Sequence, residues 1–289
     1  LFAEPDILWE AVEATRAVDS PTQPAEAGAF PNDPYYTRQW AHPRIRSGLA
    51  WDLTTGDTDI TIAVIDTGID STHPDLSAKV VPGHSFLTDD QGVVHEDSNP
   101  VDLNGHGTHV AGIAAAITDN STGVAGMSWG ARIMPVRVLK ADGTGWTSDI
   151  ARGITWAVQN GADVINLSLG SENDSWTVNV AIEDAHNALT LLVAAMGNYS
   201  TDTPFYPATH PDTIAVSATD FGDNLAYYSN YGSACDIAAP GGELFSGDFS
   251  QGIYSTLPTN TSFFLHTEWG YYQNYDYLQG TSQATPFVA

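Results

Sequence analysis

Basic residues and cysteine are both scarce in this chain, and long apolar runs are missing. Its 289 residues include nine Lys and Arg against 35 Asp and Glu, which gives a formal net charge of -26. A protein this acidic repels phosphate backbones and anionic lipids, so we expect neither nucleic acid nor a membrane among its partners. No stretch of about 18 apolar residues is present, which argues against a membrane-spanning helix.

The single cysteine, Cys235, excludes any disulfide within the chain. A chain of this length buries a large core without covalent cross-links, so one α/β domain needs none. Lys79 and Lys140 are the only lysines. We interpret the excess of carboxylates as a solvated acidic surface, a composition that also suits a saline habitat or a calcium-binding protein.

Short apolar runs alternate with segments of helical spacing along most of the chain. We expect strands over residues 61–66, 133–139, 164–169, 191–195 and 214–217, and helices over 106–117, 147–159 and 178–189. This alternation predicts a parallel sheet covered by helices on both faces, with the active site at the carboxyl ends of the strands. The aromatic-rich segment 241–278 has no clear period, and we interpret it as an enlarged surface loop.

Three short motifs supply the groups that nucleophilic acyl transfer needs. Asp66 ends the apolar run Ala-Val-Ile-Asp-Thr-Gly, His106 lies in Asn-Gly-His-Gly-Thr-His, and Ser282 lies in Gln-Gly-Thr-Ser-Gln-Ala-Thr-Pro. In such chemistry a hydroxyl attacks, an imidazole takes its proton, and a carboxylate orients the imidazole. We therefore predict that Asp66, His106 and Ser282 form one catalytic site.

Each of these residues has a competing interpretation. His109 is a second imidazole on the same helix, and two such residues could bind zinc, although the Glu of the zinc-protease arrangement is missing between them. Asp70 and Asp75 are acidic neighbours of Asp66, but only Asp66 follows an apolar strand. A serine at a helix start, as at Ser282, also serves as a cap.

The order Asp, His, Ser is the subtilisin order, and the three motifs together resemble the subtilisin-like serine protease family. Within the family the chain resembles the thermitase-like branch, because residues 117–124 match its calcium loop. The resemblance runs from about Pro31 to Ala289. It implies a three-layer α/β fold and a secreted, extracellular, monomeric serine endopeptidase that acts on proteins or peptides through an acyl-enzyme intermediate. The usual Met after the nucleophile is Gln283 here, and the usual His after Thr-Pro is Phe287.

The resemblance also assigns binding residues around the catalytic groups. Asn198 matches the asparagine that stabilises the oxyanion, and Phe205 stands where the floor of the primary specificity pocket is expected. Two segments match the edges between which a substrate peptide is paired: Gly143, Thr144 and Gly145, and Ser168, Leu169 and Gly170. Ordinary turns and loops are the alternative for these segments.

A calcium site is implied by the match of Ile117–Val124 to the family's calcium loop. The expected ligands are the side chains of Asp33, Asp75 and Asn120 and the backbone oxygens of Ile117, Thr122 and Val124. Calcium prefers six to eight oxygen ligands of these kinds. A plain turn rich in Asn, Ser and Gly is the alternative. Asp97, Asn99 and Asp102 form a more speculative second cation site.

The two ends of the chain differ in character from its middle. We expect residues 1–30 to be the tail of the protein's own propeptide and a linker, and residues 31–289 to be a peptidase domain truncated just after Ser282. The alternative function is a catalytically inactive binding protein with the same fold. A lipase-like hydrolase would need Gly-x-Ser-x-Gly and the order Ser, acid, His, and the chain has neither.

Overall fold

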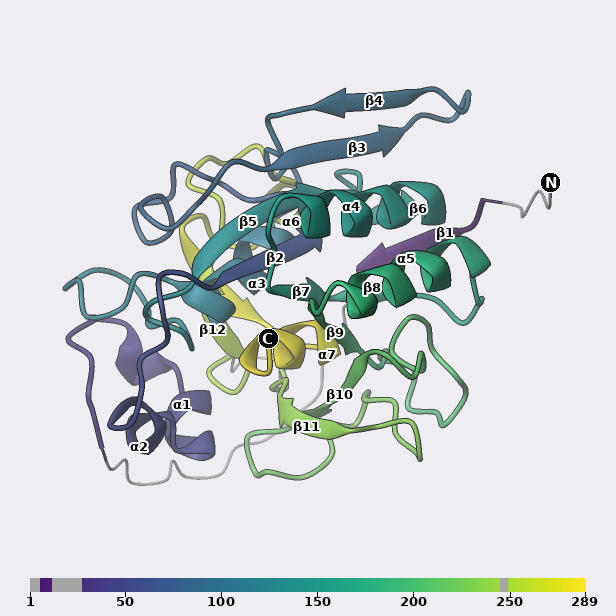
Figure 1. Cartoon of the computed structure of the whole chain (residues 1–289). Coiled ribbons are helices and arrows are strands. Elements are labelled where there is room, and N and C mark those ends of the chain that lie inside the picture. The colour runs from purple at the N-terminus through teal and green to yellow at the C-terminus, as the bar shows by residue number, and fades with distance from the viewer. Residues whose placement is uncertain (1–5, 12–27, 245–248) are drawn as a thin grey trace.

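An eight-stranded sheet forms the centre of the computed structural model, which describes residues 6–11, 28–244 and 249–289 (Figure 1). The strand order is β11-β10-β9-β7-β2-β5-β3-β4, and all neighbouring pairs are parallel except β3 with β4. The strands of this sheet are β2 (Thr61–Asp66), β3 (His84–Thr88), β4 (Val94–Asp97), β5 (Arg132–Arg137), β7 (Val164–Leu167), β9 (Leu191–Ala195), β10 (Ile214–Thr219) and β11 (Ile237–Pro240).

Helices cover both faces of the sheet, as the sequence predicts. Figure 1 shows α4 and α5 in front of the central strands and α3 behind them. The helices are α1 (Ala41–Ile45), α2 (Ser47–Trp51), α3 (His106–Ala115), α4 (Thr147–Gln159), α5 (Trp176–Asn187), α6 (Phe264–Trp269) and α7 (Thr281–Ala284), with 3₁₀ turns at Tyr36–Arg38 and Thr285–Phe287.

Strand β2 shows why both faces must be covered. Its side chains alternate between two cores, because successive residues of a strand point to opposite faces. Ile62 and Val64 pack with α3, whereas Ala63 and Ile65 pack with α4 and α5. All four are essentially inaccessible to solvent, which explains the unbroken apolar run before Asp66.

The predicted strand over residues 164–169 is interrupted at Ser168. The structure divides it into β7 and the short β8 (Leu169–Gly170), which leaves the main sheet. Strand β8 instead joins a three-stranded sheet with β1 (Leu8–Ala11) and β6 (Thr144–Trp146). The break at Ser168 therefore divides the chain between the eight-stranded sheet, which contains β7, and the three-stranded sheet, which contains β8.

The prediction of a loop over residues 241–278 is wrong for much of that segment. Strands β12 (Ile253–Thr256) and β13 (Tyr275–Leu278) form an antiparallel pair, and α6 lies between them in sequence. All four residues of β12 are buried, so the strand lacks the polar–apolar alternation by which a strand is recognised. Leu257, Phe263, Leu265 and Leu278 form a small core of their own there.

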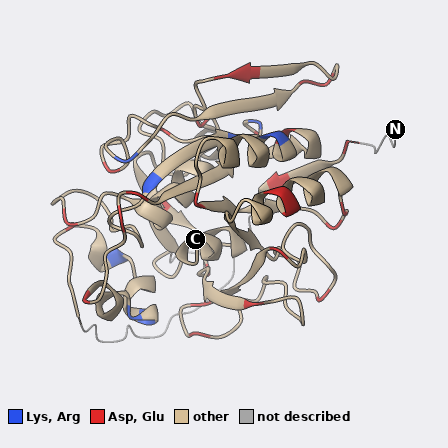
Figure 2. Cartoon of the chain, viewed as in Figure 1, with Lys and Arg blue, Asp and Glu red and all other residues tan. Residues whose placement is uncertain are grey.

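Acidic residues lie on strands, helices and loops throughout the described part of the molecule, and basic residues are few (Figure 2). Among the described residues, Lys140 pairs with Asp90 at 3.2 Å and Arg152 with Asp149 at 2.7 Å. Cys235 is a half-buried free thiol. None of the helices in the described part of the chain has the length and apolar character of a membrane-spanning segment.

Acid sensitivity is expected from the buried imidazole of His42. Its Nδ1 lies 3.1 Å from Ser47 Oγ and its Nε2 lies 3.2 Å from the Ala125 carbonyl oxygen. Burial lowers the pKa of His42 to about 4. The folded chain therefore binds fewer protons than the unfolded chain between the two pKa values, so stability is full above about pH 6.5 and declines toward pH 4.

The expected loss is roughly 3 kcal/mol in the free energy of unfolding by pH 4. Urea denaturation at pH 7.5 and pH 4.5 measures it. His42→Gln should be less stable at pH 7.5 but should depend less on pH, whereas His186→Gln, at an exposed site, should keep the native dependence. An unchanged pH dependence in His42→Gln would contradict the prediction.

Candidate active site

Asp66 and His106 form a buried pair at the carboxyl end of β2. His106 Nδ1 lies 2.8 Å from Asp66 Oδ1 and 3.0 Å from Oδ2, and both side chains are fully buried. The backbone N–H of Thr67 donates to Asp66 Oδ1 at 2.7 Å. Because the carboxylate accepts from Nδ1–H, the neutral imidazole has its acceptor at Nε2, the tautomer that a general base requires.

Asp102 fixes the start of α3, where His106 is the first residue. It accepts the backbone N–H groups of Asn104, Gly105 and Thr108 at 2.8–2.9 Å. A carboxylate in this place caps the helix and complements its dipole. This role of Asp102 was not predicted, because the residue lies four positions before His106 and the N-cap itself is Gly105.

The same contacts correct the speculative second cation site. The hydroxyls of Thr67 and Thr108 also donate to Asp102, at 2.9 and 2.6 Å, so its two oxygens accept five hydrogen bonds from the protein. Asp97 accepts the backbone N–H of Asn99 at 3.0 Å. Since both carboxylate oxygens of Asp102 already accept hydrogen bonds from protein groups, Asp102 is not available as a cation ligand.

Ser282 lies in the first turn of α7, which contacts α3. Its Oγ donates to the Ser168 carbonyl oxygen at 2.9 Å, and Ser168 Oγ donates back to the Ser282 carbonyl oxygen at 2.8 Å. These two hydrogen bonds connect α7, which carries Ser282, to Ser168, the residue between β7 and β8. The hydroxyl is thus held at the same edge of the sheet as Asp66.

Asn198 follows β9 and is oriented by Thr281. The backbone N–H and the hydroxyl of Thr281 lie 2.9 and 3.0 Å from Asn198 Oδ1. Since a backbone N–H can only donate, the Asn198 oxygen must face it and the amide nitrogen must point away. Among the described residues, that buried nitrogen has no hydrogen-bond partner. A donor next to Ser282 is thereby left available.

The chain's own strand β1 lies between the two segments predicted to bind substrate. It pairs antiparallel with β6 and with β8, so that Glu10 stands opposite both Thr144 and Gly170. Ala11 N–H donates to the Gly143 carbonyl oxygen at 2.9 Å. Trp9 is only 1% exposed and packs in the core of α4 and α5. An extended peptide therefore fits this edge.

Phe205 occupies the space between β8 and the loop that carries Asn198. It is 1% exposed and packs against Ala195. An added Cβ on Gly170 would come within 2.4 Å of the Phe205 ring, and one on Gly197 within 3.0 Å. The ring therefore fills volume that the two glycines leave open.

The expected calcium ligands come together beside Asn120. Asp33 accepts the backbone N–H groups of Asp119 and Asn120 at 2.8 and 3.1 Å, and Asp75 Oδ1 accepts from the Asn120 side-chain nitrogen at 2.9 Å. Burial, with repulsion from Asp33, raises the pKa of Asp75 to about 6, and burial also raises the pKa of Asp33. In the described chain, no three His, Cys, Asp or Glu side chains gather at one point.

His109 takes no part in the Asp66–His106 pair. Its Nε2 lies 3.1 and 3.2 Å from the carbonyl oxygens of Ile253 and Asp276, so it joins α3 to the β12–β13 pair. Burial, followed by the neighbouring His106, lowers the pKa of His109 to about 3. His109 thus contacts backbone carbonyl oxygens of β12 and β13, whereas His106 is the histidine paired with Asp66.

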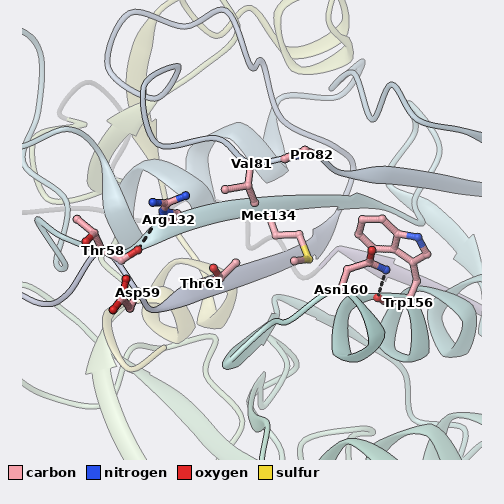
Figure 3. A pocket seen from close by; sticks show the side chains of 9 residues that line it. All are labelled: Thr58, Asp59, Thr61, Val81, Pro82, Arg132, Met134, Trp156 and Asn160. Atoms are coloured by element: carbon pink, nitrogen blue, oxygen red, sulfur yellow. Dashed lines mark hydrogen bonds between the residues drawn. The ribbon is translucent and has the colours of Figure 1, made fainter.

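A separate hollow of about 450 Å³ lies beside the start of β2, away from these groups (Figure 3). Its polar side chains bond to neighbouring backbone: Arg132 Nε donates to the Thr58 carbonyl oxygen at 2.9 Å and Asn160 Nδ2 to the Trp156 carbonyl oxygen at 2.8 Å. Because its lining contains no Ser, Cys or His side chain, this hollow is a weaker candidate site than the Asp66 edge.

Residues 57–289 match the family described as Peptidase_S8, the subtilase family. The chain belongs to the subtilase family. Two relatives of this subtilase are 45% identical to it over 90% of the chain: a thermophilic serine proteinase of Bacillus sp. (strain AK1) and thermitase of Thermoactinomyces vulgaris. The resemblance to the family and to its thermitase-like branch is thus confirmed.

A solved structure supports the subtilase fold independently. A protease from Pseudoalteromonas arctica PAMC 21717 is 37% identical, superposes with a TM-score of 0.80, and is matched over 90% of this chain and 85% of its own. The chain spans 58% of the Bacillus proteinase and 82% of thermitase. The predicted three-layer α/β fold and the class of enzyme, a subtilase-type serine peptidase, are confirmed at the level of the family.

Proposed function

We propose that this subtilase is a secreted, monomeric serine endopeptidase that hydrolyses proteins through an acyl-enzyme intermediate. The observation that carries the proposal is the buried Asp66–His106 pair beside the helix of Ser282. Ser282 is the nucleophile, His106 the general base and Asp66 the group that orients it. Rotation of the Ser282 hydroxyl away from Ser168 would direct its proton to His106 Nε2, and its oxygen would attack the substrate carbonyl.

Asn198 is the proposed donor to the oxyanion. When Ser282 attacks, negative charge develops on the carbonyl oxygen, and a fixed N–H group nearby stabilises that charge more than it stabilises the uncharged substrate. The two bonds from Thr281 hold the amide in place before the reaction, so little reorganisation is needed. His106 then returns its proton to the departing amine, and water repeats the sequence to release the acid.

Strand β1 is proposed to be the end of the protein's own propeptide, bound as a substrate would be. Backbone pairing to two sheet edges is the usual way in which an extended peptide is recognised. Upstream, Asp6 Oδ1 accepts the Ser148 N–H at 2.9 Å and so caps the start of α4. The linker expected before residue 31 lies largely outside the described residues.

Covalent labelling and hydrolysis test the proposed function together. The protein should cleave a chromogenic peptide, and an organophosphate should both stop that cleavage and modify Ser282, as located by mass spectrometry. Ser282→Ala should neither cleave nor be labelled. If the organophosphate modifies another serine, or if the native protein cleaves nothing, the proposed function is wrong and the chain is a binding protein.

We also propose that calcium is held by Asp33, Asp75 and Asn120 with the carbonyl oxygens of Ile117, Thr122 and Val124. Two buried carboxylates with raised pKa values fit a cation, since their mutual repulsion and desolvation are relieved by a positive charge. In this structure the Asn120 amide nitrogen donates to Asp75, so that amide would turn over to offer its oxygen. The ion would supply stability and take no part in the chemistry.

Chelation is therefore expected to lower the melting temperature and to speed autolysis. A ligand that binds only the folded state stabilises it by about 2.7 kcal/mol at a hundredfold excess over its dissociation constant. Differential scanning calorimetry with calcium and with chelator measures the difference. Asp75→Ala and Asn120→Ala should shrink it, and Asn99→Ala should not. Equal melting temperatures with and without chelator would exclude the calcium site.

Phe205 is expected to restrict the residue just before the cleaved bond to small or medium side chains such as alanine. A phenyl ring in a pocket takes the volume that a large substrate side chain needs, and one methylene of fit already changes selectivity by about 1–3 kcal/mol. Peptides ending in Ala and in Phe at this position compare the two cases. Phe205→Gly should shift the preference toward Phe. Equal cleavage of both peptides, or an unchanged ratio in Phe205→Gly, would contradict it.

A further inference from the structure

The segment between β12 and β13 forms a fixed wall next to the catalytic histidine. Leu265 N–H donates to the Asn104 carbonyl oxygen at 3.0 Å, two residues before His106. Phe263 is fully buried, and a Cβ added to Gly105 would come within 2.9 Å of its ring. The wall, meaning the described segment between β12 and β13, is therefore packed onto the loop that leads into α3, and its position is fixed relative to that loop.

Trp269, the last residue of α6, brings this wall to the substrate-binding cleft. Its side chain is 57% exposed, although its ring sits edge-on to Phe264 at 5.8 Å between centroids. A cavity of about 360 Å³ is lined by Trp269 together with Asn104, Asp142 and Asn198, and by Glu10 and Ala11 of β1. Trp269 thus borders the space that contains the proposed oxyanion donor.

Ala11 leaves most of this space unfilled. A Cβ placed on Gly143 would lie 3.8 Å from the Ala11 Cβ and 3.6 Å from the side-chain nitrogen of Asn104, so the Ala11 methyl lies on the Asn104 side of β1. A methyl group occupies a small part of a cavity of this size. A longer side chain at the Ala11 position would extend into the cavity that Trp269 lines.

The charges around the cavity indicate which long side chain fits. Its described lining contains the carboxylates of Glu10 and Asp142 and neither Lys nor Arg. Glu10 belongs to β1 and leaves when a substrate replaces that strand, whereas Asp142 stays. The face of an indole ring attracts cations, and the apolar stem of Arg or Lys packs well against an aromatic ring.

We propose that Trp269 is a specificity-determining residue that, with Asp142, favours substrates carrying Arg or Lys at the position that Ala11 holds. The inference rests on the proposed endopeptidase function. The side chain lays its methylene groups on the indole ring and brings its positive end to the Asp142 carboxylate. A neutral side chain of the same length would pack on the indole ring but would gain no attraction to the Asp142 carboxylate.

Peptide kinetics give the first test. The substrates are Leu-Trp-Gln-X-Val with a chromogenic amide, where X is Arg, Met or Ala, so that no substrate carboxylate stands at the Glu10 position. We expect kcat/KM to be highest for Arg, and Trp269→Ala to lower the ratio of Arg to Ala by about five- to tenfold. Asp142→Asn should lower cleavage of the Arg peptide alone. Trp176→Ala, at an exposed tryptophan outside the cavity, is the matched control.

A double-mutant cycle on the intact chain gives the second test and needs no activity. In a Ser282→Ala background, Ala11→Arg should raise the melting temperature when Trp269 is present and raise it less in Trp269→Ala. Equal shifts in both backgrounds would overturn the inference, as would a Met peptide cleaved as well as the Arg peptide. Coupling in the cycle without any hydrolysis by the native chain would count against the proposed function instead.

Discussion

Ser282→Ala is expected to lower kcat by about a millionfold while KM stays nearly unchanged. The hydroxyl forms a bond only in the transition state and the acyl-enzyme, so removing it costs little in substrate binding. His106→Ala should lose about as much, and Asp66→Ala less, about ten-thousandfold. The double variant Ser282→Ala/His106→Ala should be no slower than either single variant, because the groups act as a unit.

Matched controls separate catalysis from folding. His109→Gln removes an imidazole three residues away and should lower the melting temperature through its lost contacts with β12 and β13, while kcat per folded molecule changes by no more than a few fold. Asp70→Asn should likewise retain activity. Losses that add up in the double variant, or a normal kcat in His106→Ala, would disprove the assignment of the triad.

Asn198→Ala should lower kcat by about 100- to 1000-fold with little change in KM, since one oxyanion donor is worth about 2.7–4 kcal/mol in this class of reaction. Asn198→Asp is the sharper variant. It keeps an oxygen to accept the two hydrogen bonds from Thr281 and replaces only the donor, so the local structure is retained.

Steady-state kinetics on one peptide, with the melting temperature of each variant, measure the effect. Asn198→Asp should lose at least as much activity as Asn198→Ala, because it adds a negative charge beside the developing oxyanion. Asn160→Ala, at an exposed asparagine in the lining of the separate hollow, should leave kcat alone. A kcat within a few fold of native in Asn198→Asp would exclude the oxyanion role.

The residues that sequence analysis identified share a local signature. Asp66 follows an apolar strand, His106 opens a helix, and Ser282 lies in a run of small residues, so short motifs fix both their chemistry and their place at strand and helix ends. The five central strands, β2, β5, β7, β9 and β10, were predictable for a related reason: both faces of each are covered, so each is a largely apolar run. Strands β3, β4 and β11 were not predicted, and β4 (Val94–Asp97) is mostly exposed and carries polar residues.

The features that were missed depend on contacts between distant parts of the chain. Asp102 caps α3 only because its loop folds back onto Thr67 and Thr108, and no spacing rule separates that carboxylate from a cation ligand. The break of strand 164–169 at Ser168 follows from Ser282, which lies 114 residues away. Strands β12 and β13 each have four residues, too short for a periodic pattern to appear among their aromatic neighbours.

The position of β1 has a consequence for how activity depends on protein concentration. While β1 is joined to the rest of the chain, its effective concentration at the cleft is set by the linker and is the same in a dilute and in a concentrated sample. After a cut between β1 and the domain, the strand becomes a separate peptide that dissociates on dilution. Specific activity should then rise as a cut sample is diluted, whereas an uncut sample should keep the same low but measurable specific activity at every dilution.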